Sequence, residues 1–238
     1  MTARPLSSLL LKVALRETMR VQDGRVPLLA RHLARLKSGG CPESVLAAAA
    51  DSVRDAARRW AEPYGRMTLL VGTDGTIEVE TSGKPSTIDV PGGPLIAVVE
   101  CVAPPLPPGA AKPADRSPWD KPLGVAQRLG ADVAVLVSPE GLIIDTSQAT
   151  IWLFLDGVLV TPPSPPALAG VSRGVVLDAA EALGIHAEEG EITLADLANA
   201  DEVILTTAVA GARAVRERGG AVAEKLSAAF DTLFGSKA

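Results

Sequence analysis

The chain has 238 residues, of which 47% are hydrophobic and 21% are charged, and its formal net charge is −5. This length allows one large domain or two smaller ones, and this composition is typical of a globular protein and not of a disordered one. An acidic chain with scattered Lys and Arg residues lacks the basic surface that nucleic-acid binding requires. We therefore expect no nucleic-acid partner.

Cysteine and histidine are too sparse for the common types of zinc site. Cys41 and Cys101 lie far apart, and the only histidines are His32 and His186, so we expect no metal. A disulfide between the two cysteines is possible, but the sequence favours two unpaired thiols in a reducing compartment. Charge at Lys12 breaks the apolar run near the N-terminus, which argues against a signal peptide, and no run reaches the ~20 apolar residues of a membrane span. We expect a cytoplasmic protein without membrane contact.

Turn residues and hydrophobic spacing predict hairpins and two helices in the first third of the chain. Residues 7–17 can form a helix or a strand, because the spacing of their apolar residues does not distinguish the two. Apolar residues at helical spacing predict a helix over 28–38, ended by Gly39-Gly40, and Pro42 opens a second helix that runs to about residue 61. The turns at 23–24 and 73–75 are typical of hairpins, with strands predicted at 18–21, 67–72 and 77–80.

Residues 84–93 are rich in Pro, Gly and Ser, and we interpret them as the linker between two lobes, 1–88 and 89–238. The second lobe is rich in strands, predicted at 95–102, 132–137, 142–144, 149–155, 158–160 and 203–206. Helices are predicted at 123–129, 171–183, 193–198 and 221–233, with proline-rich irregular segments at 103–118 and 162–170. Mixed strands and helices of this kind predict an α+β fold.

Four dispersed features can carry chemistry, although each also has an ordinary structural explanation. The run Gly170-Val171-Ser172-Arg173 opens a helix, and helix N-termini bind phosphate readily. Thr206-Thr207 ends an apolar strand, where hydroxyl groups often line a site but can equally form a polar turn. Asp145 ends another strand and can hold a cation or make local turn hydrogen bonds. Arg35 lies on the polar side of an apolar helix, and its ordinary explanation is a solvated or salt-bridged arginine.

Five segments of the chain occur in an order and spacing typical of one family. They are residues 17–36 with ETMRV and RHLARL, 131–152 with AD and later DTS, 159–173 with LVTPP and LAGVSR, 188–200, and 206–215 with TTAVAGARAV. Each segment is weakly specific, but together they cover nearly the whole chain in register. The chain therefore resembles the class IV aminotransferases, the fold-type IV pyridoxal-phosphate enzymes.

Two lysines compete for the role of the Schiff-base lysine of that family. The family's lysine lies some thirty-odd residues before the carboxylate that faces the pyridine nitrogen. Lys112 lies 33 positions before Asp145, and Lys121 lies 24 positions before it. The pattern K-x-x-D-R that begins at Lys112 also resembles the lysine segment of aminodeoxychorismate lyase-like members. We therefore choose Lys112, which makes Lys121 an ordinary surface residue.

The resemblance implies a site for pyridoxal 5'-phosphate. Lys112 would bind the cofactor covalently and later move a proton at the substrate Cα, since a lysine amine suits both tasks once desolvation lowers its pKa. Asp145 would keep the pyridine nitrogen protonated, which makes the ring an electron sink. The cofactor phosphate would be held through charge-assisted and helix-terminal hydrogen bonds by Arg35, Val171, Ser172 and Thr206 or Thr207.

Several positions depart from the family pattern. Asp145 stands where the family usually has Glu, and it is one methylene shorter. Ala111 replaces the usual His before the lysine, and Pro113 restricts Lys112 to extended conformations. Thr150 replaces an Asn. These departures support an alternative hypothesis, in which this chain is a non-catalytic relative that binds a ligand or a partner chain.

We expect a two-lobed α+β or α/β protein of the D-amino acid aminotransferase-like fold, with the cofactor in the cleft between its lobes and a second copy as homodimer partner. The run TTAVAGARAV and the K-x-x-D-R pattern favour a lyase of folate biosynthesis that converts 4-amino-4-deoxychorismate to 4-aminobenzoate and pyruvate. The alternative activity is an aminotransferase that acts on branched-chain or D-amino acids. Because substrate choice depends on the site and not on the fold, both stay open.

Overall fold

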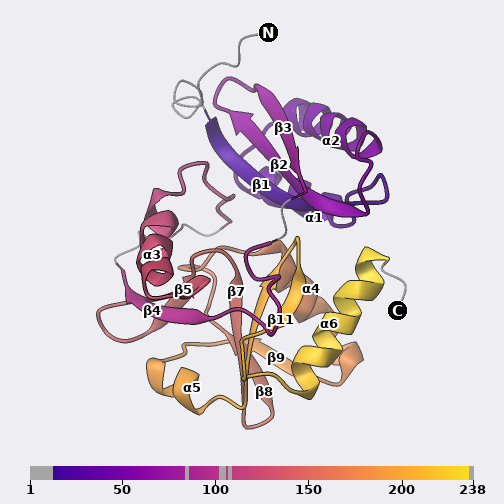
Figure 1. The fold of residues 1–238 in the computed structure, drawn as a ribbon. Helices are drawn as coiled ribbons and strands as arrows, with labels where there is room; N and C mark the ends of the chain where they lie inside the picture. The colour runs from indigo at the N-terminus through magenta and orange to yellow at the C-terminus, as the bar shows by residue number, and fades with distance from the viewer. Residues whose placement is uncertain (1–12, 84–85, 102–105, 107–108, 236–238) are drawn as a thin grey trace. The chain divides into compact units, whose positions relative to one another are not determined.

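The structure, a computed structural model, describes residues 13–83, 86–101, 106 and 109–235 (Figure 1). Contacts divide these residues into two compact units, which are described separately below. One unit takes the described residues of Met1–Lys84 and Gly109–Arg116, and the other those of Pro85–Pro108 and Ser117–Ala238. Residues 109–116, which carry Lys112, thus group with the first unit, and the lobes 1–88 and 89–238 stay a prediction of the sequence.

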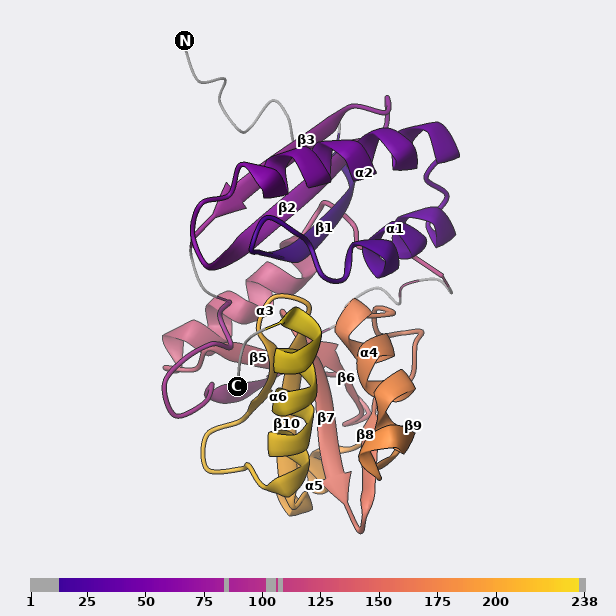
Figure 2. The same ribbon diagram turned by 90° about the vertical axis from the view of Figure 1, so that its right-hand side faces the viewer.

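The first unit is an antiparallel sheet with two helices on one of its faces (Figure 2). Its strands have the order β1-β2-β3, and its elements are β1 (Val13–Gln22), α1 (Leu29–Ser38), α2 (Glu43–Arg58), β2 (Tyr64–Gly72) and β3 (Ile77–Ser82). The core between helices and sheet includes Met19, Leu36, Val53, Met67 and Leu69, all with 0% exposure. The undecided segment 7–17 is a strand from Val13 onward, while residues 7–12 lie outside the described part.

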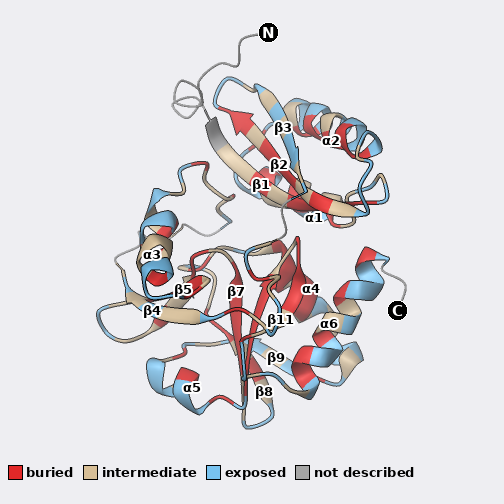
Figure 3. Ribbon diagram, in the orientation of Figure 1, coloured by how far each residue is buried: buried red, intermediate tan, exposed pale blue. Residues whose placement is uncertain are grey.

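The second unit contains two sheets. The larger sheet has the order β11-β10-β7-β8-β9, and the smaller has the order β4-β5-β6 with β4 and β5 parallel. Their strands are β4 (Ile96–Glu100), β5 (Val133–Val137), β6 (Ile143–Thr146), β7 (Thr150–Leu155), β8 (Val158–Thr161), β9 (His186–Glu189), β10 (Glu202–Thr207) and β11 (Gly211–Ala214). Figure 3 shows burial concentrated along the central strands, and β5, most of β7 and most of β10 are buried.

The helices of the second unit pack against these sheets. They are α3 (Ser117–Arg128), α4 (Val171–Ala180) followed by a 3-10 turn (Glu181–Leu183), α5 (Leu194–Asn199) and α6 (Ala221–Phe234). Helices α4 and α6 cover the same face of the larger sheet (Figure 2). The predicted capping box is confirmed, because the Thr193 side chain accepts a hydrogen bond from the Asp196 amide and the Asp196 carboxylate accepts one from the Thr193 amide.

Helix α3 departs from the prediction, since it begins at Ser117 and not at residue 123. Prolines discourage a helix because Pro has no N–H to donate and its ring crowds the preceding turn. Pro118 lies in the first turn, where this costs little, but Pro122 lies inside the helix. Trp119, Pro122 and Ala126 form its buried face against the β4–β5 sheet. The free energy gained by burying that face therefore outweighs the unfavourable effect of Pro122 on the helix.

The mixed α+β class predicted from the sequence is confirmed. Strands β9 and β11 escaped the prediction because their sequences, HAEE and GARA, lack the β-branched and aromatic residues that favour strands. Within the described residues, no helix combines the length and the hydropathy that crossing a bilayer requires.

Candidate active site

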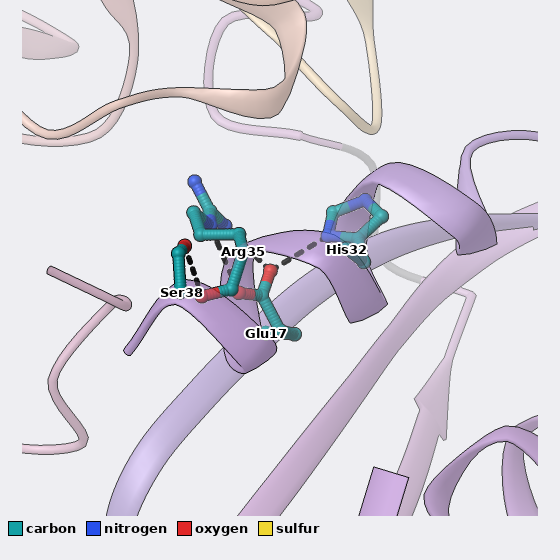
Figure 4. Close-up of polar contacts among 4 residues, drawn as sticks. All are labelled: Glu17, His32, Arg35 and Ser38. Atoms are coloured by element: carbon teal, nitrogen blue, oxygen red, sulfur yellow. Dashed lines mark hydrogen bonds and ion pairs between the residues drawn. The ribbon is translucent and has the colours of Figure 1, made fainter. Parts of the chain in front are cut away.

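Arg35 is held by a buried carboxylate on the neighbouring strand. Glu17 lies on β1 in the same alternating row as the core residues Met19 and Val21, and its exposure is 0%. It accepts two hydrogen bonds from the Arg35 guanidinium, from Nε at 2.8 Å and from Nη2 at 2.5 Å. His32, one turn before Arg35 on α1, contacts the same carboxylate through Nδ1 at 2.6 Å (Figure 4). The strand and the helix together therefore fix the guanidinium.

The charges of this cluster follow from its burial. Burial alone would raise the pKa of Glu17, but the Arg35 charge and the hydrogen bonds from His32 and Arg35 outweigh it and lower the pKa to about 2. Burial lowers the pKa of His32, against the opposing effect of Glu17. At neutral pH the cluster therefore consists of an ionised carboxylate, a charged guanidinium and a neutral imidazole.

Lys112 lies in an irregular segment that is fastened to the same strand. Its carbonyl oxygen accepts a hydrogen bond from the Arg16 amide at 2.9 Å, and its neighbour Pro113 forms a bridge with Leu15. On the other side, a Cβ built on Gly39 would lie 2.3 Å from Cβ of Ala111. Only a glycine at the end of α1 permits this approach, so the lysine segment and the helix that carries Arg35 are packed backbone to backbone.

The Lys112 amine is half-buried among positive charges. Loss of hydration lowers its pKa most, the guanidinium groups of Arg116 and Arg35 lower it further, and Glu17 opposes them. The resulting pKa is about 7, so a large fraction of the amine is neutral and nucleophilic at physiological pH. The competing Lys121 is exposed on α3, in the second unit.

Gly39→Ala is expected to destabilise the first unit by about 1–3 kcal/mol, the usual cost of forcing extra atoms into a packed region. The added Cβ would also lie 2.9 Å from the Ala111 nitrogen, so the backbone has to move. Thermal and urea denaturation measure the loss. In the control Gly124→Ala, inside α3, the new Cβ meets only the end of Arg128 at 3.7 Å, and a helix-interior alanine should stabilise. Equal stability of Gly39→Ala and parent would contradict the close approach.

Asp145 lies on β6, opposite Leu136 of β5. The strand extends to Thr146, beyond the predicted end at residue 144. The Asp145 carboxylate accepts hydrogen bonds from the backbone amides of Thr146 at 2.8 Å and Leu168 at 3.4 Å. The bond from Leu168 joins β6 to the proline-rich loop before α4, and the two bonds together hold a half-buried carboxylate in place. Within the described part of the chain, no cluster of His, Cys, Asp and Glu could hold a metal ion.

The start of α4 and the end of β10 carry the other predicted site residues. Val171 and Ser172 are buried in the first turn of α4, which packs against β10 and has no acidic residue there. The N-cap is Gly170, where a Cβ would lie 2.8 Å from Oγ1 of Thr150. Thr206 is buried and accepts a hydrogen bond from Nε1 of Trp152 at 3.1 Å, and Oγ1 of Thr207 accepts one from the Ala210 amide at 2.9 Å.

The predicted site residues thus form two groups. Arg35 and Lys112 belong to the first unit, and the second unit contains Asp145, Val171, Ser172, Thr206 and Thr207. Sequence reasoning missed the roles of Glu17 and His32. A signal was present, because an acidic residue in the apolar row of a strand needs a buried partner, and His32 lies one helical turn from Arg35.

Comparison with known proteins gives these groups a family context. Residues 14–217 match the sequence model of the family described as amino-transferase class IV. The chain belongs to the class IV aminotransferase family. A branched-chain-amino-acid aminotransferase of Pseudomonas aeruginosa is 33% identical over 117 residues, which are 45% of this chain and 38% of that relative. The matched region therefore spans less than half the length of that curated relative.

Solved structures of the family share the fold over nearly the whole chain. A hypothetical aminotransferase from Mycobacterium tuberculosis, in its PLP-bound form, has a TM-score of 0.83 at 22% identity and covers 99% of this chain and 94% of its own. A structure described as a candidate 4-amino-4-deoxychorismate lyase has a TM-score of 0.77 at 23% identity, with 95% and 94% covered. These likenesses confirm the fold-type IV architecture, and the cofactor expected from the sequence is the one bound in the first of them.

Proposed function

We propose that this protein is a pyridoxal-phosphate enzyme in which Lys112 binds the cofactor and Arg35 binds its phosphate. The observation that carries the proposal is the Lys112 amine, whose pKa desolvation and the neighbouring guanidinium groups lower to about 7. An ordinary lysine, with a pKa near 10.5, is almost fully protonated at neutral pH and cannot attack a carbonyl carbon. The lowered pKa is thus the property that covalent binding of an aldehyde requires.

The donor groups of the chain fit the chemistry of this cofactor. The planar guanidinium of Arg35 has five N–H donors in a fork that matches the oxygens of a phosphate, and its bonds to Glu17 fix the plane of that fork. The first turn of α4 lacks a side-chain cap and acidic residues, which suits an anion. We propose that Val171, Ser172, Thr206 and Thr207 add phosphate contacts and that Asp145 pairs with the protonated pyridine nitrogen.

Bound pyridoxal phosphate supplies an electron sink for the carbon that carries the substrate amino group. The chain supplies the base. We propose that Nζ of Lys112 takes the proton from that carbon, because an amine with a pKa of about 7 can both accept and return a proton at neutral pH. Asp145, held by two backbone amides, keeps its carboxylate oriented during the reaction.

For the reaction itself we propose the conversion of 4-amino-4-deoxychorismate to 4-aminobenzoate and pyruvate. Nζ of Lys112 would take the proton from the amino-bearing ring carbon, the neighbouring carbon–oxygen bond would break, and a ring double bond would form. The departing enol gains a proton and becomes pyruvate, so atoms balance without an oxidant or a co-substrate. The K-x-x-D-R pattern at Lys112 and the likeness to the candidate lyase structure support this choice.

A second candidate function is transamination of branched-chain amino acids. It is favoured by the relative from Pseudomonas aeruginosa, whose described activity is of this kind and which is 33% identical over 45% of this chain. Both activities need the same lysine and phosphate contacts, but transamination also requires a keto acid that accepts the amino group.

The two activities are separated by their products. With 4-amino-4-deoxychorismate and added pyridoxal phosphate, we expect 4-aminobenzoate and pyruvate in equal amounts, measured by fluorescence and by a coupled assay for pyruvate. With leucine, isoleucine or valine and 2-oxoglutarate, we expect no glutamate. Glutamate without pyruvate would replace the lyase by the transaminase, and a protein that binds no cofactor would favour the non-catalytic reading.

We further propose a cytoplasmic homodimer, which the family resemblance implies. Light scattering coupled to size-exclusion chromatography should give about twice the 24.5 kDa mass of the chain. A mass of one chain, unchanged by added pyridoxal phosphate, would contradict it.

A further inference from the structure

Glu17, His32 and Arg35 form a buried polar cluster in the first unit, and the Glu17 carboxylate is its acidic group. Its side chain has 0% exposure, and the Arg35 side chain to which it bonds has 9%. The two hydrogen bonds, from Nε and Nη2, form a fork that fixes both the position and the plane of the guanidinium. The Ser38 hydroxyl bonds to the Arg35 carbonyl oxygen at 3.0 Å and helps to hold the backbone at the end of α1 (Figure 4).

Stability alone gives little reason for such a pair. Taking two charges out of water costs several kcal/mol, and apolar residues of similar volume are often as stable or more stable in the same place. Glu17 lies in the row of Met19 and Val21, where an apolar side chain would join the core directly. A carboxylate at this point is instead useful for what it orients.

His32 strengthens this arrangement without adding charge. The ionised Glu17 carboxylate can only accept, so Nδ1 of His32 must be the donor of their 2.6 Å contact. Because burial lowers the pKa of His32 below its ordinary value of 6.5, the imidazole is neutral at neutral pH and carries its proton on Nδ1. Its Nε2 atom is buried and has no hydrogen-bond partner in the described part of the chain. The imidazole thus orients the carboxylate through a hydrogen bond without neutralising its charge, and Arg35 is the positively charged partner of Glu17 among these three residues.

We propose that Glu17, oriented by His32, is a positioning residue that holds the Arg35 guanidinium ready for the cofactor phosphate. The inference rests on the proposed function, in which Arg35 binds that phosphate. A guanidinium fixed before binding loses less side-chain freedom when the phosphate arrives, so affinity for the phosphate rises. Glu17 itself touches only Arg35 and His32 in this cluster and acts on the cofactor through Arg35.

The same carboxylate also acts on Lys112 through space. The groups that shift the pKa of Lys112 are the positive charges of Arg116, Arg35 and Arg16, which lower it, and Glu17, which raises it. Removal of the Glu17 charge should therefore lower the pKa of Lys112 further, while a variant that keeps the charge should not. This shift reports the presence of the Glu17 charge beside Lys112, whereas the ratio of the affinities for a ligand with and without the phosphate reports the positioning of Arg35.

The test compares two ligands that differ only in the phosphate, pyridoxal phosphate and pyridoxal, titrated against the full-length protein by absorbance. Glu17→Gln keeps the shape of the side chain and removes its charge. We expect its affinity for pyridoxal phosphate to fall about tenfold, the size of effect that outer partners of ligands have at metal sites, with the affinity for pyridoxal nearly unchanged. The apo protein should also show a lower pH midpoint for acylation of Lys112, followed by mass spectrometry.

Glu202→Gln is the matched control. Glu202 is also buried, and it accepts hydrogen bonds from the amides of Val222 at 3.0 Å and Ala223 at 2.8 Å at the start of α6 in the other unit. Its loss should lower the melting temperature but leave the ratio of the two affinities unchanged. Equal weakening of both ligands by Glu17→Gln would reduce Glu17 to a structural role and overturn the inference.

His32 variants keep the inference testable if Glu17→Gln does not fold. His32→Leu removes the Nδ1 donor and should weaken pyridoxal phosphate binding severalfold, whereas His32→Asn places an amide donor near the Nδ1 position and should restore most of it. No difference between the two variants would count against the inference. A parent protein that binds neither ligand would overturn the proposed function itself. A parent that binds both equally well would overturn the proposed phosphate contacts, and with them the role of Glu17, while leaving the role of Lys112 in place.

Discussion

Lys112→Ala is expected to abolish covalent binding of pyridoxal phosphate and to reduce activity by more than about a thousandfold, since the lysine is both the nucleophile and the base. In the parent, borohydride should fix the cofactor on the peptide that contains Lys112, as seen by mass spectrometry. The matched control is Lys121→Ala, because Lys121 is exposed on α3. A cofactor fixed on Lys121, or retained by Lys112→Ala, would overturn the assignment.

The pH dependence of this binding follows from the same amine. With a pKa of about 7, Lys112 is mostly protonated below pH 7 and mostly neutral above it, so the rate of covalent binding should rise through pH 7 and then level off. A lysine whose pKa falls on folding costs stability below its ordinary pKa. Lys112→Met should therefore leave the apo protein at least as stable as the parent at pH 7, which separates loss of chemistry from loss of folding.

Much of the fold could be predicted from local pattern. The helix α1 and its glycine stop, the hairpin between β2 and β3, and the capping box at Thr193 all follow from residues close together in the sequence. Family resemblance added the overall architecture, which local pattern does not specify. The class IV family and the fold are confirmed.

The parts that escaped prediction depend on contacts between distant residues. Helix α3 tolerates Pro122 because its buried face packs on a sheet whose strands lie on either side of it in the chain. Strands β9 and β11 form because neighbouring strands offer free edges, although their own residues have little strand preference. A single sequence contains no direct record of such pairings.

The site shows the same division. The residues chosen through the resemblance, such as Lys112 and Arg35, were found by motif. Glu17 and His32 belong to those motifs too, but their role depends on a contact between a strand and a helix. Glu17 lies 15 positions before His32 and 18 positions before Arg35, and only the fold brings both side chains to its carboxylate. In this chain the motif residues therefore form a three-residue contact and not only an isolated arginine.

Glu17→Gln is expected to lower the stability of the first unit by on the order of 3 kcal/mol at pH 7, the range found when one partner of a buried ion pair is removed. The pKa of Glu17 is about 2 in the folded protein, against an ordinary value of 4.5. Because this pKa is depressed, the stabilisation is fully present above about pH 4.5 and is lost as the pH falls toward 2. The difference between variant and parent should shrink across that window.

Melting temperatures recorded from pH 7 down to pH 3 measure this convergence. Glu43→Gln serves as the control, because Glu43 pairs with Lys37 on the surface, where both side chains are more than half exposed, and an exposed pair contributes less than about 1 kcal/mol. Parallel curves for Glu17→Gln and the parent over the whole range would mean that the ionised carboxylate does not stabilise the fold. Convergence would show that the protein maintains a buried charge at neutral pH, which is the condition under which Glu17 can hold Arg35.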